Sequence, residues 1–213
     1  MTTALPARSR AKRDAILDAA RTSFLANGYQ GTSVDQIAAA AAVSKQTVYK
    51  HFGDKRELLS AIVHTVLDGA VRPFAERVAH LSESTDLRTD LTALGIDYLR
   101  SVLSEPVVGL RRLVVAEAGR VPELAELYYR QAPARTLAAF ADAFADLDRR
   151  GALAVPDAAL AAEHFAFLVV GRSIDQALFF GGPRTLAELD LEAYVGAGVR
   201  VFLAAYRDVA RAV

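Results

Sequence analysis

The sequence predicts an all-α protein, and three observations carry this prediction. Apolar residues recur every three or four positions over most of the 213 residues, as they do along one face of an α-helix. Proline and glycine separate these segments, and no stretch alternates apolar and polar residues between turn signals as a β-strand would. We expect about nine helices, divided between a small N-terminal domain over residues 1–53 and a larger domain over 54–213.

Three helices are expected in the N-terminal domain. Ser33 and Ser44 each precede a short helical pattern, and their hydroxyl oxygens can accept hydrogen bonds from the free N–H groups of a helix start. Gly53 ends the third helix in a tight turn. The short connection between the second and third helices predicts a helix-turn-helix. The three helices are expected over roughly 10–26, 33–40 and 45–51.

The larger domain is expected to contain six helices. Each begins with a proline, whose missing N–H is not needed in a first turn, or with an aspartate that can cap it. A long helix runs through Leu147 with a kink at Pro133, and the last two reach Phe180 and Arg211. The six starts are expected near Asp54, Asp86, Pro106, Pro122, Asp157 and Asp190.

The helix over 45–51 has two different sides. Val48 and Phe52 point to the core, and the opposite side consists of residues with hydrogen-bonding side chains. Such a cluster has no use in a core, but it suits phosphate oxygens and the base edges of a major groove. These residues are Lys45, Gln46, Thr47, Tyr49, Lys50 and His51.

The zero net charge of the chain conceals an asymmetry. Residues 1–60 contain nine cationic and five anionic side chains, which leaves this part at +4 and the rest at −4. A basic end on an acidic body suits a protein that docks one end on a polyanion. Arg8, Arg10, Lys12 and Arg13 lie in a tail that is expected to act either as an arm on DNA or as an ordinary solvated terminus.

Two runs, GYQGTSVDQIA at 28–38 and VSKQTVYKHFGDKRELL at 43–59, resemble the DNA-binding domain of the tetracycline-repressor (TetR) family of bacterial transcriptional regulators. The resemblance is sharp over residues 10–62. Many members have glycine in the turn where this chain has Ala42. A left-handed backbone at Ala42 would cost about 1 kcal/mol.

The resemblance implies a homodimeric DNA-binding regulator, most often a repressor, that grips a pseudo-palindromic operator and is released by a small molecule. Lys45, Gln46 and Thr47 are expected to read bases, while other polar residues hold phosphates. For Thr32 or Ser33, an ordinary capping role is an equal alternative. The expected DNA-binding residues are Thr32, Ser33, Ser44, Lys45, Gln46, Thr47, Tyr49, Lys50, His51 and Lys55.

The larger domain is expected to bind an apolar or aromatic effector. Similar proteins line their pocket with helices on which Tyr98, Phe140, His164 and Phe167 fall here. The last two long helices have more apolar residues than one face can bury, so a second copy of the chain is expected to cover them. The alternative is that these helices lie wholly inside the core.

Catalysis has no support in the sequence. The chain lacks cysteine, an HExxH motif and a GxSxG motif, and we expect no enzyme activity, cofactor or metal. The longest apolar run, 165–171, is too short to span a bilayer, so we expect no membrane partner and a cytoplasmic protein at the nucleoid. The rival hypotheses are a nucleoid-associated DNA-binding adaptor with a protein partner and no small-molecule switch, and a helical enzyme or ligand carrier.

Overall fold

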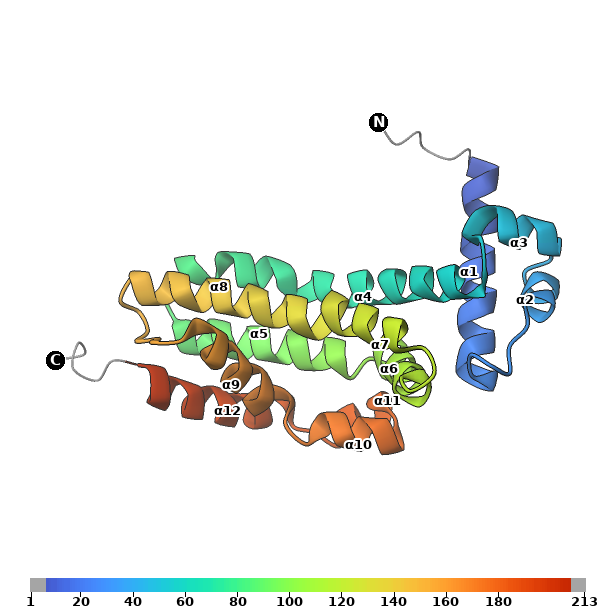
Figure 1. Cartoon of the computed structure of the whole chain (residues 1–213). Helices are drawn as coiled ribbons and strands as arrows, with labels where there is room; N and C mark the ends of the chain where they lie inside the picture. Colours follow the sequence, from blue (N-terminus) through green and yellow to red (C-terminus); the bar gives the residue numbers. More distant parts are fainter. Residues whose placement is uncertain (1–6, 208–213) are drawn as a thin grey trace. The chain divides into compact units, whose positions relative to one another are not determined.

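The computed structural model describes residues 7–207, apart from the side chain of residue 73. Within this range the chain forms helices and turns but no strand, which confirms the predicted all-α class (Figure 1). The bounds are α1 (Ala7–Asn27), α2 (Val34–Ala40), α3 (Lys45–Phe52), α4 (Lys55–His80), α5 (Leu87–Val102), α6 (Glu105–Glu117), α7 (Pro122–Tyr129), α8 (Arg135–Arg149), α9 (Ala158–Val170), α10 (Ser173–Phe180), α11 (Gly182–Ala187) and α12 (Leu191–Tyr206).

The described residues contain twelve α-helices, and the expectation of about nine was too low. A π-helical turn at Arg130–Ala134, with Pro133 inside it, divides the expected long helix into α7 and α8. The helix expected from Asp157 to Phe180 also divides, because Gly171 takes φ +44° and ends α9. The short α11 was not expected from the sequence.

The chain divides into two compact units. The first unit consists of the described residues up to Val66 together with Gly109–Tyr128, and the second consists of Leu67–Val108 and the described residues from Tyr129 onward. Both α4 and α6 therefore begin in one unit and end in the other. The expected domain boundary between residues 53 and 54 stays a proposal.

The first unit is built on a small apolar core. Ile16 and Phe24 on one face of α1, Ile37 on α2 and Val48 on α3 are all buried. The second helix contacts both α1 and α3. The helix starts are as predicted, since Ser33 and Ser44 accept hydrogen bonds from backbone N–H groups of the first turns of α2 and α3.

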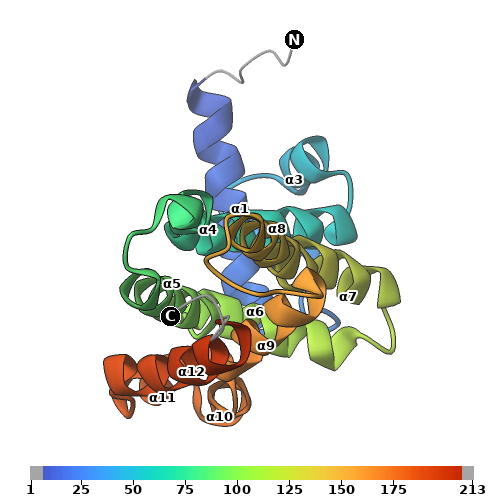
Figure 2. The same cartoon turned by 90° about the vertical axis from the view of Figure 1, so that its left-hand side faces the viewer.

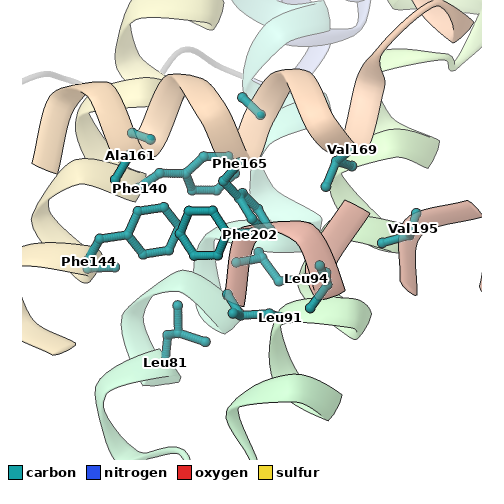
Figure 3. Packing of buried hydrophobic residues seen from close by; sticks show 14 of the residues in the cluster. Leu81, Leu91, Leu94, Phe140, Phe144, Ala161, Phe165, Val169, Val195 and Phe202 are labelled. Atoms are coloured by element: carbon teal, nitrogen blue, oxygen red, sulfur yellow. The ribbon is translucent and has the colours of Figure 1, made fainter. Parts of the chain in front are cut away.

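The second unit has a core of stacked and edge-on aromatic rings (Figure 3). Phe140 and Phe144 on α8 meet Phe165 on α9, and Phe202 on α12 packs against Phe144 with 5.0 Å between ring centroids. Figure 2 shows α9 beside α12, and α9 contacts α5, α8 and α12. Phe140 is fully buried among these rings.

Gly198 lets α12 approach the backbone of α9. A Cβ at this position would lie 2.8 Å from the carbonyl oxygen of Leu168, which is too close for any real Cβ contact. At Gly196, two residues earlier, only the guanidinium of Arg200 lies within 4 Å of such a Cβ. The close backbone approach at Gly198 thus lies inside one chain.

Among the described residues, no single helix is both long and apolar enough to cross a membrane. A bent pair of segments, Lys55–Arg72 and Phe74–Glu83, meets that criterion by length and composition alone.

Candidate nucleic-acid interface

The third helix is held by its two ends. The Ser44 hydroxyl oxygen accepts a hydrogen bond from the Thr47 N–H at 3.1 Å, and its side chain also bonds the Thr47 hydroxyl at 2.8 Å. At the other end Gly53 takes φ +72° and donates its N–H to the Tyr49 carbonyl. Both ends had been predicted from the serine and the glycine.

The two sides of α3 separate as predicted. Val48 and Phe52 are buried in the core of the first unit. The opposite side carries the polar residues, of which Thr47 and His51 are partly buried and the others are exposed. The exposed residues of this side are Lys45, Gln46, Tyr49 and Lys50, and the capping residue Ser44 is exposed beside them.

Lys45 already has an anionic partner within the first unit. Its Nζ lies 2.9 Å from Oδ2 of Asp35 on α2, and this hydrogen bond is the main reason that the pKa of Lys45 is raised. A base or a phosphate that binds Lys45 must use another of its three ammonium protons or displace this carboxylate. Sequence spacing gave no sign of the pair, because the two residues come from different helices.

Ser33 and Thr32 have different surroundings. Ser33 is exposed and forms a capping box with Gln36, whose side-chain oxygen accepts from the Ser33 N–H at 2.7 Å. Thr32 is buried, and its hydroxyl lies 2.8 Å from the Gly28 carbonyl oxygen and 3.0 Å from the Ser23 carbonyl oxygen. A proton donated to these carbonyls is not available to a phosphate, so the hydrogen bonds describe an internal role for Thr32.

Lys55 is directed toward the loop between α1 and α2. Its Nζ donates to the carbonyl oxygens of Tyr29 at 2.8 Å and Thr32 at 3.0 Å, and it lies 4.2 Å from the centroid of the Tyr29 ring. Two of the three ammonium protons are used in these bonds. A phosphate contact from Lys55 must use the third proton or displace a carbonyl.

The basic N-terminal residues are helical rather than an extended arm. Arg8, Arg10, Lys12 and Arg13 lie in the first two turns of α1, which begins at Ala7. The guanidinium of Arg13 lies 5.1 Å from the centroid of the Phe52 ring, a cation–π contact with the end of α3. These four residues are therefore helical rather than part of a tail, their contact with DNA stays a prediction, and residues 1–6 lie outside the described range.

The four predicted effector-binding residues do not share one pocket. Tyr98 and Phe140 pack edge to face with 5.2 Å between their centroids. His164 and Phe167 instead lie on the outer side of α9, where Phe167 is 66% exposed and His164 Nδ1 is 2.6 Å from the Tyr206 hydroxyl. Three positions separate His164 from Phe167, so both fall on the helix face opposite Phe165.

A groove of about 370 Å³ lies elsewhere in the second unit, between the second half of α4 and α8. Its lining is mostly apolar, with polar groups contributed by Ser82 and, on α8, by Arg135, Thr136, Asp142 and Asp146. Tyr98 and Phe140 pack behind it, since both rings contact Phe74. The sequence pattern that could have indicated this groove is the helical spacing of small residues, which is the same on α4 and α8. Its lining includes Val71, Phe74, Val78, Thr136, Ala139 and Asp142.

Large apolar side chains are exposed on the last helices of the second unit. Phe179 and Phe180 at the end of α10 are 80% and 59% exposed, and Phe167 on α9 and Val201 on α12 are also exposed. Exposed apolar side chains mark a site of interaction where they join into one large patch, so these residues are candidates for contact with a partner.

Comparison with known proteins supports the assignment of a helix-turn-helix. The similarity also extends to residues beyond this motif. Residues 16–62 match the family described as bacterial regulatory proteins of the tetR family. Residues 89–208 match the C-terminal domain of AefR-like transcriptional repressors, which is more than half of the chain.

Solved structures and curated relatives are similar over different lengths. A structure assigned to the TetR-family transcriptional regulators from Mesorhizobium loti MAFF303099 is 34% identical with a TM-score of 0.85, and the match covers 95% of this chain and 100% of that one. The flavonoid-responsive regulator FrrA is 29% identical with a TM-score of 0.77, over 93% and 98% of the two chains. The regulator UidR of Escherichia coli K12 is 32% identical over 59% of each chain. The first curated relatives are matched over 23% to 59% of their own length.

Proposed function

Because this chain belongs to the TetR family of bacterial transcriptional regulators, we propose that it represses transcription by binding an operator as a homodimer. The observation that carries the proposal is the polar side of α3, which is turned outward by the buried Val48 and Phe52. Two copies would insert this helix into successive major grooves, with half-sites about 34–36 Å apart in the simplest geometry.

The DNA-binding side chains divide into two roles in this proposal. Gln46, Lys45 and Thr47 read base edges, and Gln46 is the residue whose amide matches adenine. Phosphates are held by groups that donate without regard to sequence. These are Ser33, Ser44, Tyr49, Lys50, His51 and Lys55, whereas Thr32 supports the loop from inside.

A small-molecule effector is proposed to bind the second unit. The mostly apolar groove between α4 and α8 is a candidate site for it, and an apolar or aromatic molecule suits the apolar part of its lining. Similarity to a regulator that is described as flavonoid-responsive supports an aromatic class. The effector lowers operator affinity by as much as it prefers the form of the protein that binds DNA poorly.

We propose that the protein acts in the cytoplasm. Selection of bound duplexes from a random DNA pool, in a buffer that resembles the cytoplasm, tests the DNA-binding part of the proposal. We expect the enriched sequences to share two inverted half-sites, and the affinity to fall steeply with salt. A chain that enriches no sequence and binds no duplex at low salt contradicts the proposal.

A second candidate function is a nucleoid-associated adaptor that recruits a protein partner without an effector. The filled ring core of the second unit and the exposed Phe179 and Phe180 favour it. The double substitution Phe179→Ser with Phe180→Ser separates the two functions. If the doubly substituted chain becomes monomeric, the surface around Phe179 and Phe180 belongs to the homodimer. The adaptor hypothesis then loses its support.

A further inference from the structure

The groove between α4 and α8 is apolar along α4. Val71, Phe74 and Val78 line it at the i, i+3, i+7 spacing of one helix face. From α8, the small side chains of Ala139 and Ala143 complete the apolar part of the lining. These residues, like the rest of the lining, all belong to the second unit, so the groove lies within one compact part of the chain. The apolar body of a small molecule can be covered here.

One of the three charged side chains in the lining has no ion pair. Nη1 of Arg135 lies 3.4 Å from Oδ1 of Asp68. Asp146 is paired with Arg149. Asp142 is exposed, and it forms neither an ion pair nor a hydrogen bond with any residue that the structure describes. The groove therefore presents one uncompensated negative charge beside its apolar part.

The groove also contains a buried hydroxyl group. Thr136 is only 5% exposed, and its hydroxyl has no hydrogen-bond partner within the described part of the chain. On other helices the hydroxyls of Thr65 and Thr92 donate to the carbonyl oxygen four residues earlier. Thr136 follows the π-helical turn, where the carbonyl oxygen four residues earlier, that of Ala132, accepts the N–H of Arg135. A ligand that supplies the missing hydrogen bond is favoured at Thr136.

We propose that this groove binds amphiphilic organic cations, with an ammonium group on Asp142, a hydrogen bond to Thr136 and an apolar or aromatic body along α4. The inference rests on the proposed function, because it names the chemical class of the effector that the groove binds. The charge of the second unit agrees with this class. Its two stretches, 67–108 and 129–213, contain seventeen acidic and thirteen basic side chains, so they attract cations. An anion of the same size is repelled by the unpaired carboxylate of Asp142.

Three indole compounds with different side chains test the preference for a cation. Tryptamine carries an ammonium group, which stays protonated at neutral pH as that of lysine does, tryptophol is neutral, and indole-3-acetate is anionic. Because the chain contains no tryptophan, the anisotropy of indole fluorescence, excited where tyrosine does not absorb, reports the probe alone. We expect tryptamine to bind about fivefold more tightly than tryptophol, the effect of one ion pair at an accessible position. Indole-3-acetate should bind most weakly.

Asp142→Asn is the decisive variant, because it removes the charge and keeps the size of the side chain. It should bind tryptamine and tryptophol with equal affinity. Asp175→Asn is the matched control, since it removes one negative charge from α10 in the same unit but outside the groove lining. It should keep the fivefold preference. Thr136→Val removes the hydroxyl and should weaken the binding of tryptamine a few-fold; an unchanged affinity would remove Thr136 from the site.

The outcomes separate this inference from the proposed function. If the chain binds no duplex but the indole series behaves as expected, the repressor proposal falls and the groove remains a cation-binding site. If the chain binds its operator but binds none of the three probes, binds all three alike, or keeps its preference in Asp142→Asn, only the inference is overturned.

Discussion

Lys45 on α3 and Asp35 on α2 form an exposed ion pair, with 2.9 Å between Nζ and Oδ2. This pair predicts that Asp35→Asn tightens DNA binding a few-fold, because DNA no longer competes with the carboxylate and one repulsive charge is lost. The free energy of unfolding should change little, as for other exposed pairs. Fluorescence anisotropy with a labelled duplex and thermal unfolding measure the two quantities. Asp18→Asn, which breaks the exposed pair with Arg21 on α1, is the control; an equal gain there would contradict a specific role for Asp35.

Gln46 and Lys50 are predicted to contact different parts of the DNA. Gln46 contacts a base edge, and Lys50 contacts a phosphate. Gln46→Ala should alter the preferred operator sequence, with a cost of about 1–3 kcal/mol at one base pair. Lys50→Ala should weaken all duplexes alike and reduce the salt slope by about one. Binding measured on the selected operator, on single-base variants and on unrelated DNA at several salt concentrations distinguishes these effects. The reverse pattern would exchange the two roles.

Ala42, in the turn between α2 and α3, has φ +52°. Because a side chain disfavours this conformation and glycine does not, Ala42→Gly should raise the free energy of unfolding by about 1 kcal/mol. Denaturant unfolding of the purified chain measures the change. Ala39→Gly, within α2, should lower the same quantity by up to about 1 kcal/mol. Loss of stability in both variants would show that the turn carries no strain.

Gly198 and Gly196 on α12 should respond to alanine in opposite directions. At Gly198 the new methyl group would collide with the Leu168 carbonyl, and we expect a loss of about 1–3 kcal/mol of stability. At Gly196 there is room, so the gain in helix propensity should stabilise the chain by about 0.5–1 kcal/mol. Midpoints of thermal or denaturant unfolding give the comparison. Equal tolerance at both positions would mean that α9 and α12 pack less closely than described.

Phe167 is predicted to lie in the homodimer interface rather than in an effector pocket. Phe167→Asp should produce monomers with little change in thermal stability of the folded chain, since the side chain is already exposed in one copy. Light scattering with size-exclusion chromatography reads the oligomeric state. Tyr129→Asp alters another exposed aromatic residue, on α7, and should leave the dimer intact. A dimer that survives Phe167→Asp would remove α9 from the interface.

Helix boundaries could be predicted from the sequence wherever they are set by one residue and its immediate neighbours. Serine before a helical pattern marks an N-cap, and Ser33 and Ser44 both cap helices. The helix boundary at Gly171 was missed because a single glycine inside an apolar pattern can either continue or end a helix, and only its positive φ distinguishes the two.

By itself the sequence determined the helical class, the starts of α2 and α3 and the polar side of α3, because these depend on residues within one or two turns of each other. The tertiary structure decided which charged side chains meet, such as Asp35 on α2 with Lys45 on α3. It also turned Phe167 outward and buried Phe140. Such pairings follow from how helices pack, and packing depends on the whole set of side chains at once, which helical periodicity does not record.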